Sequence, residues 1–237
     1  NVVRTVAEVG GYAYGKSDGT VWVNLYGSST LDTMVAEGGR IRLEQKTNYP
    51  WGGDVRITIV QCDPVSIALK LRIPGWAESA RLKVDGEPVH VPAHPGTYAT
   101  IRRTWRSGTT IDLQIPMPPR LLESHPLVEE TRNHVAVKRG PVVYCLESID
   151  LPQETSLADI RIPSDIKLQP RFDAELLQGV TVVQGTVVSR PSGSWQGTLY
   201  REFKRSDAVP LPAVFIPYYT WANRGRSEMT VWIPLDY

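Results

Sequence analysis

Hydrophobic and polar residues alternate along short segments between residues 19 and 116, which is the pattern of β-strands with one buried face. Residues 66–73 are the clearest example, because Ile67, Leu69 and Leu71 take every second position. The same alternation predicts strands at residues 20–26, 40–46, 54–60, 98–103 and 110–115. Sheets with one apolar and one polar face are usually antiparallel. This part of the chain is therefore expected to form an antiparallel β-sandwich.

Residues 81–91 predict a hairpin within the same block. Apolar residues at alternate positions lead into and out of Asp85-Gly86, a dipeptide that supports the positive φ of a tight turn. With this hairpin the block has about seven or eight strands, and turn signals recur about every 8–12 residues, as in a β-sandwich.

Residues 1–14 carry a helical pattern instead. Apolar residues recur there at spacings of three and four, at Val2, Val3, Val6, Val9 and Ala13. Gly10 and Gly11 weaken the helix by about 1 kcal/mol each relative to alanine. A helix this short is marginal alone in water, so it needs a partner that covers its apolar side. We expect that partner upstream of residue 1.

A proline-rich stretch, residues 116–119, interrupts the strand pattern and predicts a boundary, because proline cannot donate to a sheet ladder. Beyond it, strands are predicted at residues 135–137, 142–146, 180–188, 198–203, 213–219 and 229–233. Residues 148–171 lack periodicity and are expected to be mostly irregular. The sequence thus predicts an all-β protein, made of two β-sandwiches or of one with a large insertion.

The balance of charged residues indicates which kinds of binding partner this protein is not expected to have. The 237 residues contain 26 Lys and Arg against 25 Asp and Glu, a formal net charge of +1. This balance argues against a nucleic-acid-binding protein. No apolar run approaches the roughly 18 residues of a membrane span. We therefore expect neither nucleic acid nor a membrane as a partner.

Cys62 and Cys145 are the only cysteines. Their spacing fits neither a disulfide framework nor a zinc site. We expect two buried free thiols that pack as small hydrophobic residues, with a single disulfide as the alternative. Unpaired thiols favour a reducing compartment such as the cytoplasm, although the sequence does not fix the localisation.

No residue is predicted to be catalytic or to bind a metal. The phosphate-binding loop, the zinc-binding helix and the nucleophile elbow are all absent. His90 and His94 are four apart, but Pro92 excludes a helix that would aim both at one ion. Glu129 and Glu130 are adjacent and would point to opposite faces of a strand. They do not form the carboxylate pair that glycoside hydrolysis requires.

Aromatic residues in predicted loops are the candidate contact residues. With one arginine they are Tyr49, Trp51, Trp76, Trp221 and Arg224. Such side chains can stack on a sugar ring, or they can fill the centre of an interdomain contact. We favour packing in the core or between domains. Trp51 is expected to tuck under its loop, and Trp76 to close one end of the core.

These residues belong to short strings that occur in one order along the chain. The strings are Tyr49-Pro50-Trp51, Arg72-Ile73-Pro74-Gly75-Trp76, Trp105, Lys138-Arg139-Gly140-Pro141-Val142-Val143-Tyr144, Trp221-Ala222-Asn223-Arg224-Gly225 and Met229-Thr230-Val231-Trp232-Ile233. Their order and spacing resemble the C-terminal half of glycoside hydrolase family 127, the β-L-arabinofuranosidase family. The resemblance runs from Asn1 to Ile233 and is weakest over residues 148–212.

The resemblance implies that the catalytic machinery lies outside this chain. Family members have an N-terminal (α/α)6 barrel, in which a cysteine is the proposed nucleophile and also binds zinc, and a glutamate acts as acid/base. Asn1 resembles the last residue of a Cys-Cys-Pro-Pro-Asn string that holds the last zinc-binding cysteines. No catalytic or zinc-binding residue of the family matches a position here, so no cofactor is expected in this chain.

The resemblance also implies a domain organisation. Residues 1–14 would be the last barrel helix, residues 15–118 with 219–237 a first jelly-roll-like β-sandwich, and residues 119–218 a second, inserted one. The chain would buttress the barrel and mediate homodimerisation without being catalytic. The alternatives are a free-standing module that binds an arabinose-containing glycan and a protein-interaction sandwich. The sequence upstream of Asn1 distinguishes them.

Overall fold

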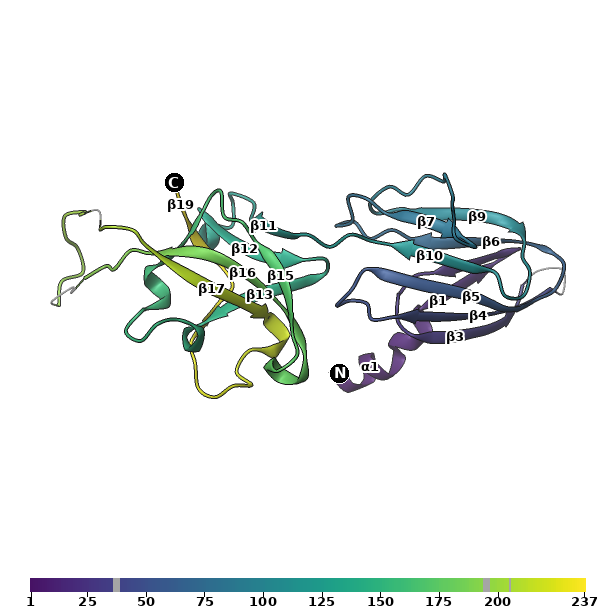
Figure 1. Cartoon of the computed structure of the whole chain (residues 1–237), viewed down its shortest axis with the longest axis horizontal. Helices are drawn as coiled ribbons and strands as arrows, with labels where there is room; N and C mark the ends of the chain where they lie inside the picture. Colours follow the sequence, from purple (N-terminus) through teal and green to yellow (C-terminus); the bar gives the residue numbers. More distant parts are fainter. Residues whose placement is uncertain (36–38, 194–196, 205) are drawn as a thin grey trace. The chain divides into compact units, whose positions relative to one another are not determined.

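A computed structural model describes residues 1–35, 39–193, 197–204 and 206–237 of the chain. The chain divides into two compact units, Asn1–Met117 and Pro118–Tyr237 (Figure 1). Both units consist mainly of β-strands, so the predicted all-β class is confirmed. The described helical segments are α1 (Val2–Glu8), η1 (Val9–Tyr12), η3 (Glu129–Thr131), η4 (Ser148–Asp150), η5 (Leu157–Asp159), η6 (Leu176–Gln178) and η7 (Tyr218–Thr220).

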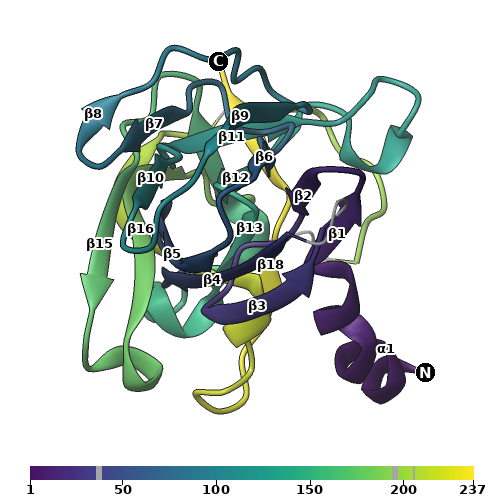
Figure 2. The same cartoon turned by 90° about the vertical axis from the view of Figure 1, so that its right-hand side faces the viewer.

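The first unit is a sandwich of two sheets (Figure 2). Its strands are β1 (Tyr14–Ser17), β2 (Thr20–Val23), β3 (Ser29–Met34), β4 (Arg40–Thr47), β5 (Asp54–Cys62), β6 (Ser66–Arg72), β7 (Arg81–Val84), β8 (Glu87–Pro88), β9 (Tyr98–Thr104) and β10 (Thr110–Gln114). One sheet has the order β1-β2-β6-β9 and the other β3-β4-β5-β10-β7-β8. Asp85 and Gly86 have positive φ between β7 and β8, so the predicted hairpin is confirmed.

The alternating residues of this unit form its core. In β5, Val55, Ile57 and Ile59 are buried, while the residues between them face outward. Apolar side chains of β6 meet them from the other sheet in one hydrophobic cluster. Trp105 is also buried there, and its indole N–H donates to the carbonyl of Ile67 at 2.9 Å. The period of two in the sequence therefore identified which side chains face inward.

Strand direction differs in one place from the antiparallel expectation. Strand β2 pairs with β6 in parallel, with Val21 opposite Leu69. The chain leaves this sheet after β2, builds β3, β4 and β5 in the other sheet, and then returns to β6. Alternation reports which face of a strand is buried and carries no information on the direction of its neighbour. The alternation also missed two edge strands, β1 and β3, which have few buried side chains.

The second unit has strands that pair in a closed ring. They are β11 (Pro119–Glu123), β12 (His134–Arg139), β13 (Val142–Glu147), β14 (Ile160–Pro163), β15 (Gln169–Asp173), β16 (Val180–Ser189), β17 (Val209–Pro217), β18 (Met229–Thr230) and β19 (Ile233–Asp236). The order β12-β19-β14-β16-β17-β13 returns to its start, because β13 also pairs with β12. Each of these strands contributes to one buried cluster that includes Tyr144 and Phe215.

Two details of the second unit correct the sequence expectations. Strands β14 and β15 lie within or at the end of residues 148–171, which were expected to be mostly irregular. The strand predicted at residues 198–203 is not formed, and Leu199 and Phe203 are 85% and 89% exposed. Strand β14 has only four residues and ends at Pro163, so it offers too few alternating positions to be recognised in the sequence.

The expected domain boundaries also need correction. Residues 219–237 belong to the second unit and do not complete the first sandwich. Strand β19 pairs with β12 and β14, and Ile233 is 1% exposed in their shared core. The two units therefore follow one another along the chain, and residues 119–218 are not an insertion. The break after Met117 agrees with the predicted proline-rich boundary.

Candidate functional site

The predicted contact residues of the first unit lie in two settings. Tyr49 packs against the core, and its ring meets Tyr26 at 5.8 Å between centroids in an edge-on contact. Trp76 also packs against this core. The Tyr26 hydroxyl donates to the carbonyl of Arg72 at 2.6 Å. Burial raises the pKa of both Tyr26 and Tyr49, in line with the packing of Tyr49 and Trp76 against the core.

Trp51 differs from the expectation that its ring tucks under the loop. Its side chain is 49% exposed at the tip of the β4–β5 connection. A tight turn presents it there, in which the Trp51 N–H donates to the carbonyl of Asn48 at 2.9 Å. The turn fixes the backbone, and the indole keeps one side open to solvent. Trp51 is therefore the candidate of this unit that can contact a ligand or a partner.

Arg224 of the second unit is bound inside a cluster of carboxylates. Its guanidinium donates to both carboxylate oxygens of Asp150, at 2.7 and 2.5 Å. It also donates to Oε2 of Glu147, from Nε at 3.2 Å and from Nη2. The other Glu147 oxygen accepts from the Ala222 N–H and from the Ser227 hydroxyl, each at 2.9 Å. Three residues of the 222–227 loop, Ala222, Arg224 and Ser227, thus direct donors towards Glu147.

The cluster ties this loop to strand β13. Glu147 ends that strand and is 1% exposed. Burial alone would raise the pKa of its carboxyl, but the bonds from Ala222, Arg224 and Ser227 outweigh burial and lower it. A buried charge is tolerated only when it is paired and hydrogen-bonded, as here. Arg224 therefore holds the fold of the loop, and a sugar would have to displace its carboxylates to reach it.

Three aromatic side chains remain exposed beside this cluster. Tyr218 is 45%, Tyr219 is 54% and Trp221 is 38% exposed. They follow β17 in the short helix η7 and the turn after it. The sequence indicated Trp221, and Tyr218 and Tyr219 are exposed neighbours of it along the chain.

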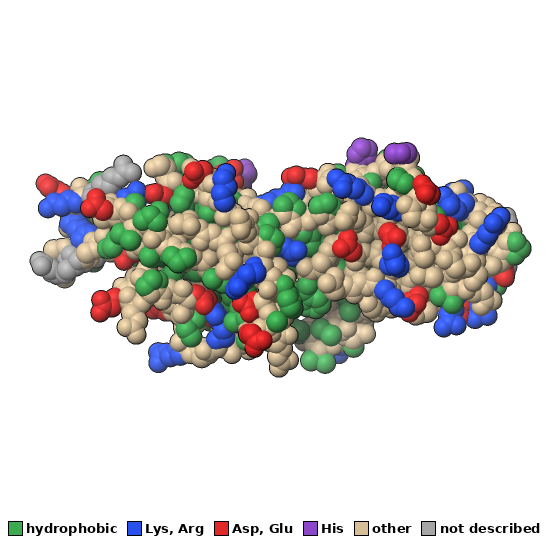
Figure 3. Space-filling model, in the orientation of Figure 1, with side chains coloured by type: hydrophobic (Ala, Val, Ile, Leu, Met, Phe, Trp, Pro, Cys, Tyr) green, Lys and Arg blue, Asp and Glu red, His purple; other side chains and the backbone are tan. Residues whose placement is uncertain are grey.

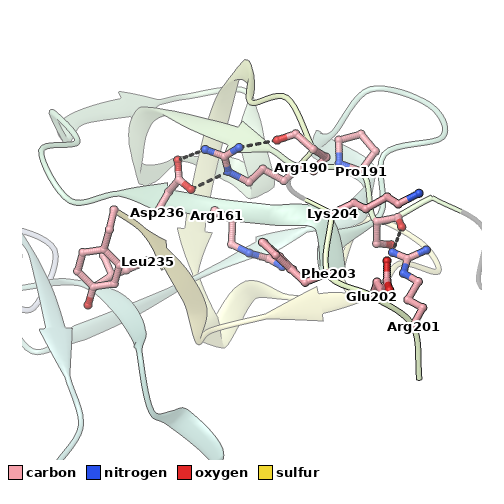
Figure 4. A pocket seen from close by; sticks show the side chains of 12 residues that line it. Arg161, Arg190, Pro191, Arg201, Glu202, Phe203, Lys204, Leu235 and Asp236 are labelled. Carbon is pink, nitrogen blue, oxygen red and sulfur yellow. Dashed lines mark hydrogen bonds and ion pairs between the residues drawn. The ribbon is translucent and has the colours of Figure 1, made fainter. Parts of the chain in front are cut away.

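A pocket of about 590 Å³ lies elsewhere in the second unit (Figure 4). Its charged lining includes Arg161, Arg190, Lys204 and Asp236. Arg190 is already satisfied, because it donates to both Asp236 oxygens, at 2.7 and 3.0 Å, and to the Ser206 carbonyl. Sequence reasoning did not find this pocket, because its residues are scattered between positions 161 and 237 without a motif.

The described residues hold no group of three or more His, Cys, Asp or Glu side chains placed to bind one metal ion. Cys145 is buried and Cys62 is half-buried, and both are free thiols, so the expected full burial is wrong for Cys62. No helix in the described part of the chain has the length and hydrophobicity needed to cross a membrane.

Comparison with known proteins identifies the two units. Residues 20–117 match the family model described as "Beta-L-arabinofuranosidase, GH127 middle domain", and residues 119–234 match the "Glycoside hydrolase family 127 C-terminal domain". The chain belongs to glycoside hydrolase family 127. The sequence resemblance is thereby confirmed, and the two matched regions meet at the boundary between the two units.

Individual proteins resemble this chain over nearly all of its length. A non-reducing end β-L-arabinofuranosidase of Bifidobacterium longum is 32% identical over 98% of this chain and 36% of its own length. A solved glycoside hydrolase is 43% identical with a TM-score of 0.91, over 99% of this chain and 39% of its own. A GH127 β-L-arabinofuranosidase from Geobacillus stearothermophilus T6 is 37% identical with a TM-score of 0.89. This match covers 100% of this chain and 37% of the relative's own length.

The chain thus spans well under half the length of these GH127 relatives. What it covers are the middle and C-terminal domains of the family.

Proposed function

We propose that this chain is the non-catalytic portion of a β-L-arabinofuranosidase and that α1 docks it onto a preceding catalytic portion. The observation that carries the proposal is the apolar face of the N-terminal helix. Val2, Val3, Val6 and Val9 are 77%, 84%, 66% and 48% exposed, and α1 has no buried residue. Hydrophobic side chains stand out on this helix in Figure 3.

No residue of α1 is buried against the rest of the first unit, so packing within this unit does not stabilise the helix. Its seven residues are too few for an isolated helix to be stable in water, so packing must supply the stability. Covering four valines would contribute several kcal/mol, at about 1.5–3 kcal/mol for each fully buried side chain. The matched family model is a middle domain, which supports a partner that precedes it.

The first test is an activity assay of the 237-residue chain on an aryl β-L-arabinofuranoside. We expect no turnover, because the described residues provide neither a metal cluster nor a predicted nucleophile. Turnover that a single substitution within residues 15–237 abolishes would refute the proposal.

The second test concerns the helix face. Val3→Asp/Val6→Asp should prevent co-purification of this chain with the preceding portion of the same gene, expressed separately. Arg4→Asp changes the opposite side of the helix, lowers the net charge by the same two units and serves as the matched control. The docking role is wrong if both variants co-purify equally well, or if the gene encodes no preceding portion. We further propose that this portion mediates homodimerisation, as the family resemblance implies, and sedimentation of the purified complex tests it.

Carbohydrate binding is a second candidate function, favoured by the exposure of Trp51 and Trp221. Trp51→Ala should then weaken binding of an arabino-oligosaccharide and leave the denaturant midpoint unchanged. Tyr49→Phe, a change at a packed neighbour, is the control. Unaltered affinity in Trp51→Ala would exclude this residue as a sugar platform.

A further inference from the structure

The outer face of the six-stranded sheet in the first unit carries a hollow that the proposed function does not use. It has a volume of about 590 Å³ and spans β4, β5, β10 and β7. Its charged lining consists of Lys46, Asp54, Arg56, Arg81, Lys83 and Asp112. We call this hollow the basic groove. Blue and red side chains lie over β5 and β10 on this face in Figure 3.

Strand register brings the cations of the basic groove together. Lys46 of β4 lies directly opposite Arg56 of β5. Asp112 of β10 lies opposite Arg56 on one side and opposite Lys83 of β7 on the other. Like charges at directly opposed positions destabilise a sheet. If this face of the sheet were only a solvent-exposed surface, a pair of opposite charges in place of Lys46 and Arg56 would make the sheet more stable.

The acids of the groove leave part of this charge uncompensated. Asp112 accepts from the Arg56 guanidinium at 2.7 and 3.2 Å, which occupies both of its oxygens. Lys46 is 3.4 Å from Glu44, in an exposed pair of the kind that contributes little. Within the described part of the chain, Arg81 and Lys83 have no carboxylate within salt-bridge distance. Both are exposed and free to bind an anion.

The lining also restricts the kind of anion. The groove has no aromatic side chain, so it offers no surface on which nucleic-acid bases could stack. Its apolar members, Val55 and Leu113, are buried side chains, so it lacks the apolar anchor of a protein interface. What remains is an open polar surface with Gln114 and charged groups. Guanidinium and ammonium groups bind carboxylates through charge-assisted hydrogen bonds, and the open polar lining admits a ligand whose other groups are hydroxyls.

We infer that the basic groove binds an oligosaccharide that carries carboxylate groups. Arg81 and Lys83 would hold one carboxylate, and Lys46 with the free edge of Arg56 would hold a second on the neighbouring strands. This site goes beyond the proposed function, because it needs neither α1 nor a catalytic portion.

The test compares two oligosaccharides of equal length by titration calorimetry at low salt, an oligogalacturonate and an uncharged arabino-oligosaccharide. The 237-residue chain should bind the oligogalacturonate, and Arg81→Gln/Lys83→Gln should weaken that binding about tenfold or more. Arg102→Gln/Arg106→Gln removes the same net charge at two exposed positions of the first unit that do not line the groove, and it should leave the affinity nearly unchanged. Added salt should weaken the binding.

Several outcomes would overturn the inference. They are no oligogalacturonate binding at low salt, equal binding of the uncharged oligosaccharide, equal loss in the control variant, and equal binding of an acidic peptide of the same charge. A thermal melt of each variant checks that it is folded. If Arg81→Gln/Lys83→Gln is unfolded, Lys46→Gln takes its place, with the same expected direction. Failure of α1 docking would leave this result unaffected, so the two proposals are distinguishable.

Discussion

Glu147 shows how one buried carboxylate can organise a loop. It is 1% exposed, and its two oxygens accept from three residues of the segment 222–227. Replacing both partners of such a bond costs little, whereas removing one leaves the other unsatisfied. The energetic role of the cluster is therefore best seen by changing a single member.

Glu147→Gln should destabilise the second unit by about 1–3 kcal/mol, because the amide loses the charge that faces Arg224 and one of the oxygens that accept hydrogen bonds. Denaturant unfolding measures the change. Glu228→Gln, at an exposed position nearby, should change stability by less than about 0.5 kcal/mol. Equal effects of the two substitutions would contradict the role assigned to the cluster.

The same carboxylate makes stability depend on pH in a defined direction. The folded-state pKa of Glu147 lies below its ordinary value of 4.5, so its contribution is complete above that value and is lost as the pH falls through the lowered pKa. The stability difference between the wild type and Glu147→Gln should stay constant from pH 7 to about pH 5 and shrink at lower pH. Unfolding curves over this range measure it. A stability difference that grows towards low pH would mean that folding raises the pKa of Glu147 and does not lower it.

The two cysteines should react differently with a thiol reagent. Cys145 is 1% exposed, and burial raises its pKa to about 12, so the reactive thiolate is scarce. Cys62 is half-buried, and its pKa is also raised by burial. Titration with a chromogenic disulfide at pH 8 should find one slow thiol in the folded chain and two after denaturation. Two fast thiols in the folded chain would contradict this, and none after denaturation would indicate a disulfide.

At the scale of elements, close backbone approach limits which residues the strands accept. Gly53 leads into β5, and a Cβ placed on it would lie 1.8 Å from the carbonyl oxygen of Ile115. The same two residues are joined by a hydrogen bond from the Ile115 N–H to the Gly53 carbonyl at 2.8 Å. Only glycine allows both the bond and the contact at this end of the β5–β10 pair.

Gly53→Ala should therefore destabilise the first unit by about 1–3 kcal/mol or more, since the backbone must move to admit the methyl group. Gly27→Ala is the control, because nothing lies within 4 Å of its Cβ position. Thermal unfolding of both variants measures the difference. Equal melting temperatures would show that the backbone at this end of the β5–β10 pair admits the methyl group without loss of stability.

At the scale of the whole molecule, each unit carries its own core. The cluster of the first unit includes Leu69 and Ile111, and that of the second includes Tyr144 and Phe215. The cores share no residue, and the chain passes from one unit to the other once, after Met117. A domain with a closed core and one connection is expected to fold by itself.

Residues 1–117 and 118–237, expressed separately, should each give a cooperative thermal transition. The full chain should show both transitions, because each core melts with its own hydrogen-bonded sheets. Scanning calorimetry of the three chains measures this. A fragment that stays unfolded while the full chain is folded would show that its stability depends on the other unit.

The sequence by itself determined the features that depend on neighbouring residues. The period of two identified the buried faces of strands such as β5 and β6, since successive side chains of a strand point to opposite sides. Asp85-Gly86 determined a turn, because its backbone preference is local. The prolines at 116–119 determined the boundary, and the ordered aromatic strings determined the family.

Only the tertiary structure decided which distant segments meet. The parallel pairing of β2 with β6 and the inclusion of β19 in the second unit depend on pairing across long stretches of chain, which alternation does not encode. The half-exposure of Trp51, the carboxylates around Arg224 and the cations of the basic groove follow from register and turn geometry. A side chain's neighbours are set by packing and strand register, and these are properties of the assembled fold.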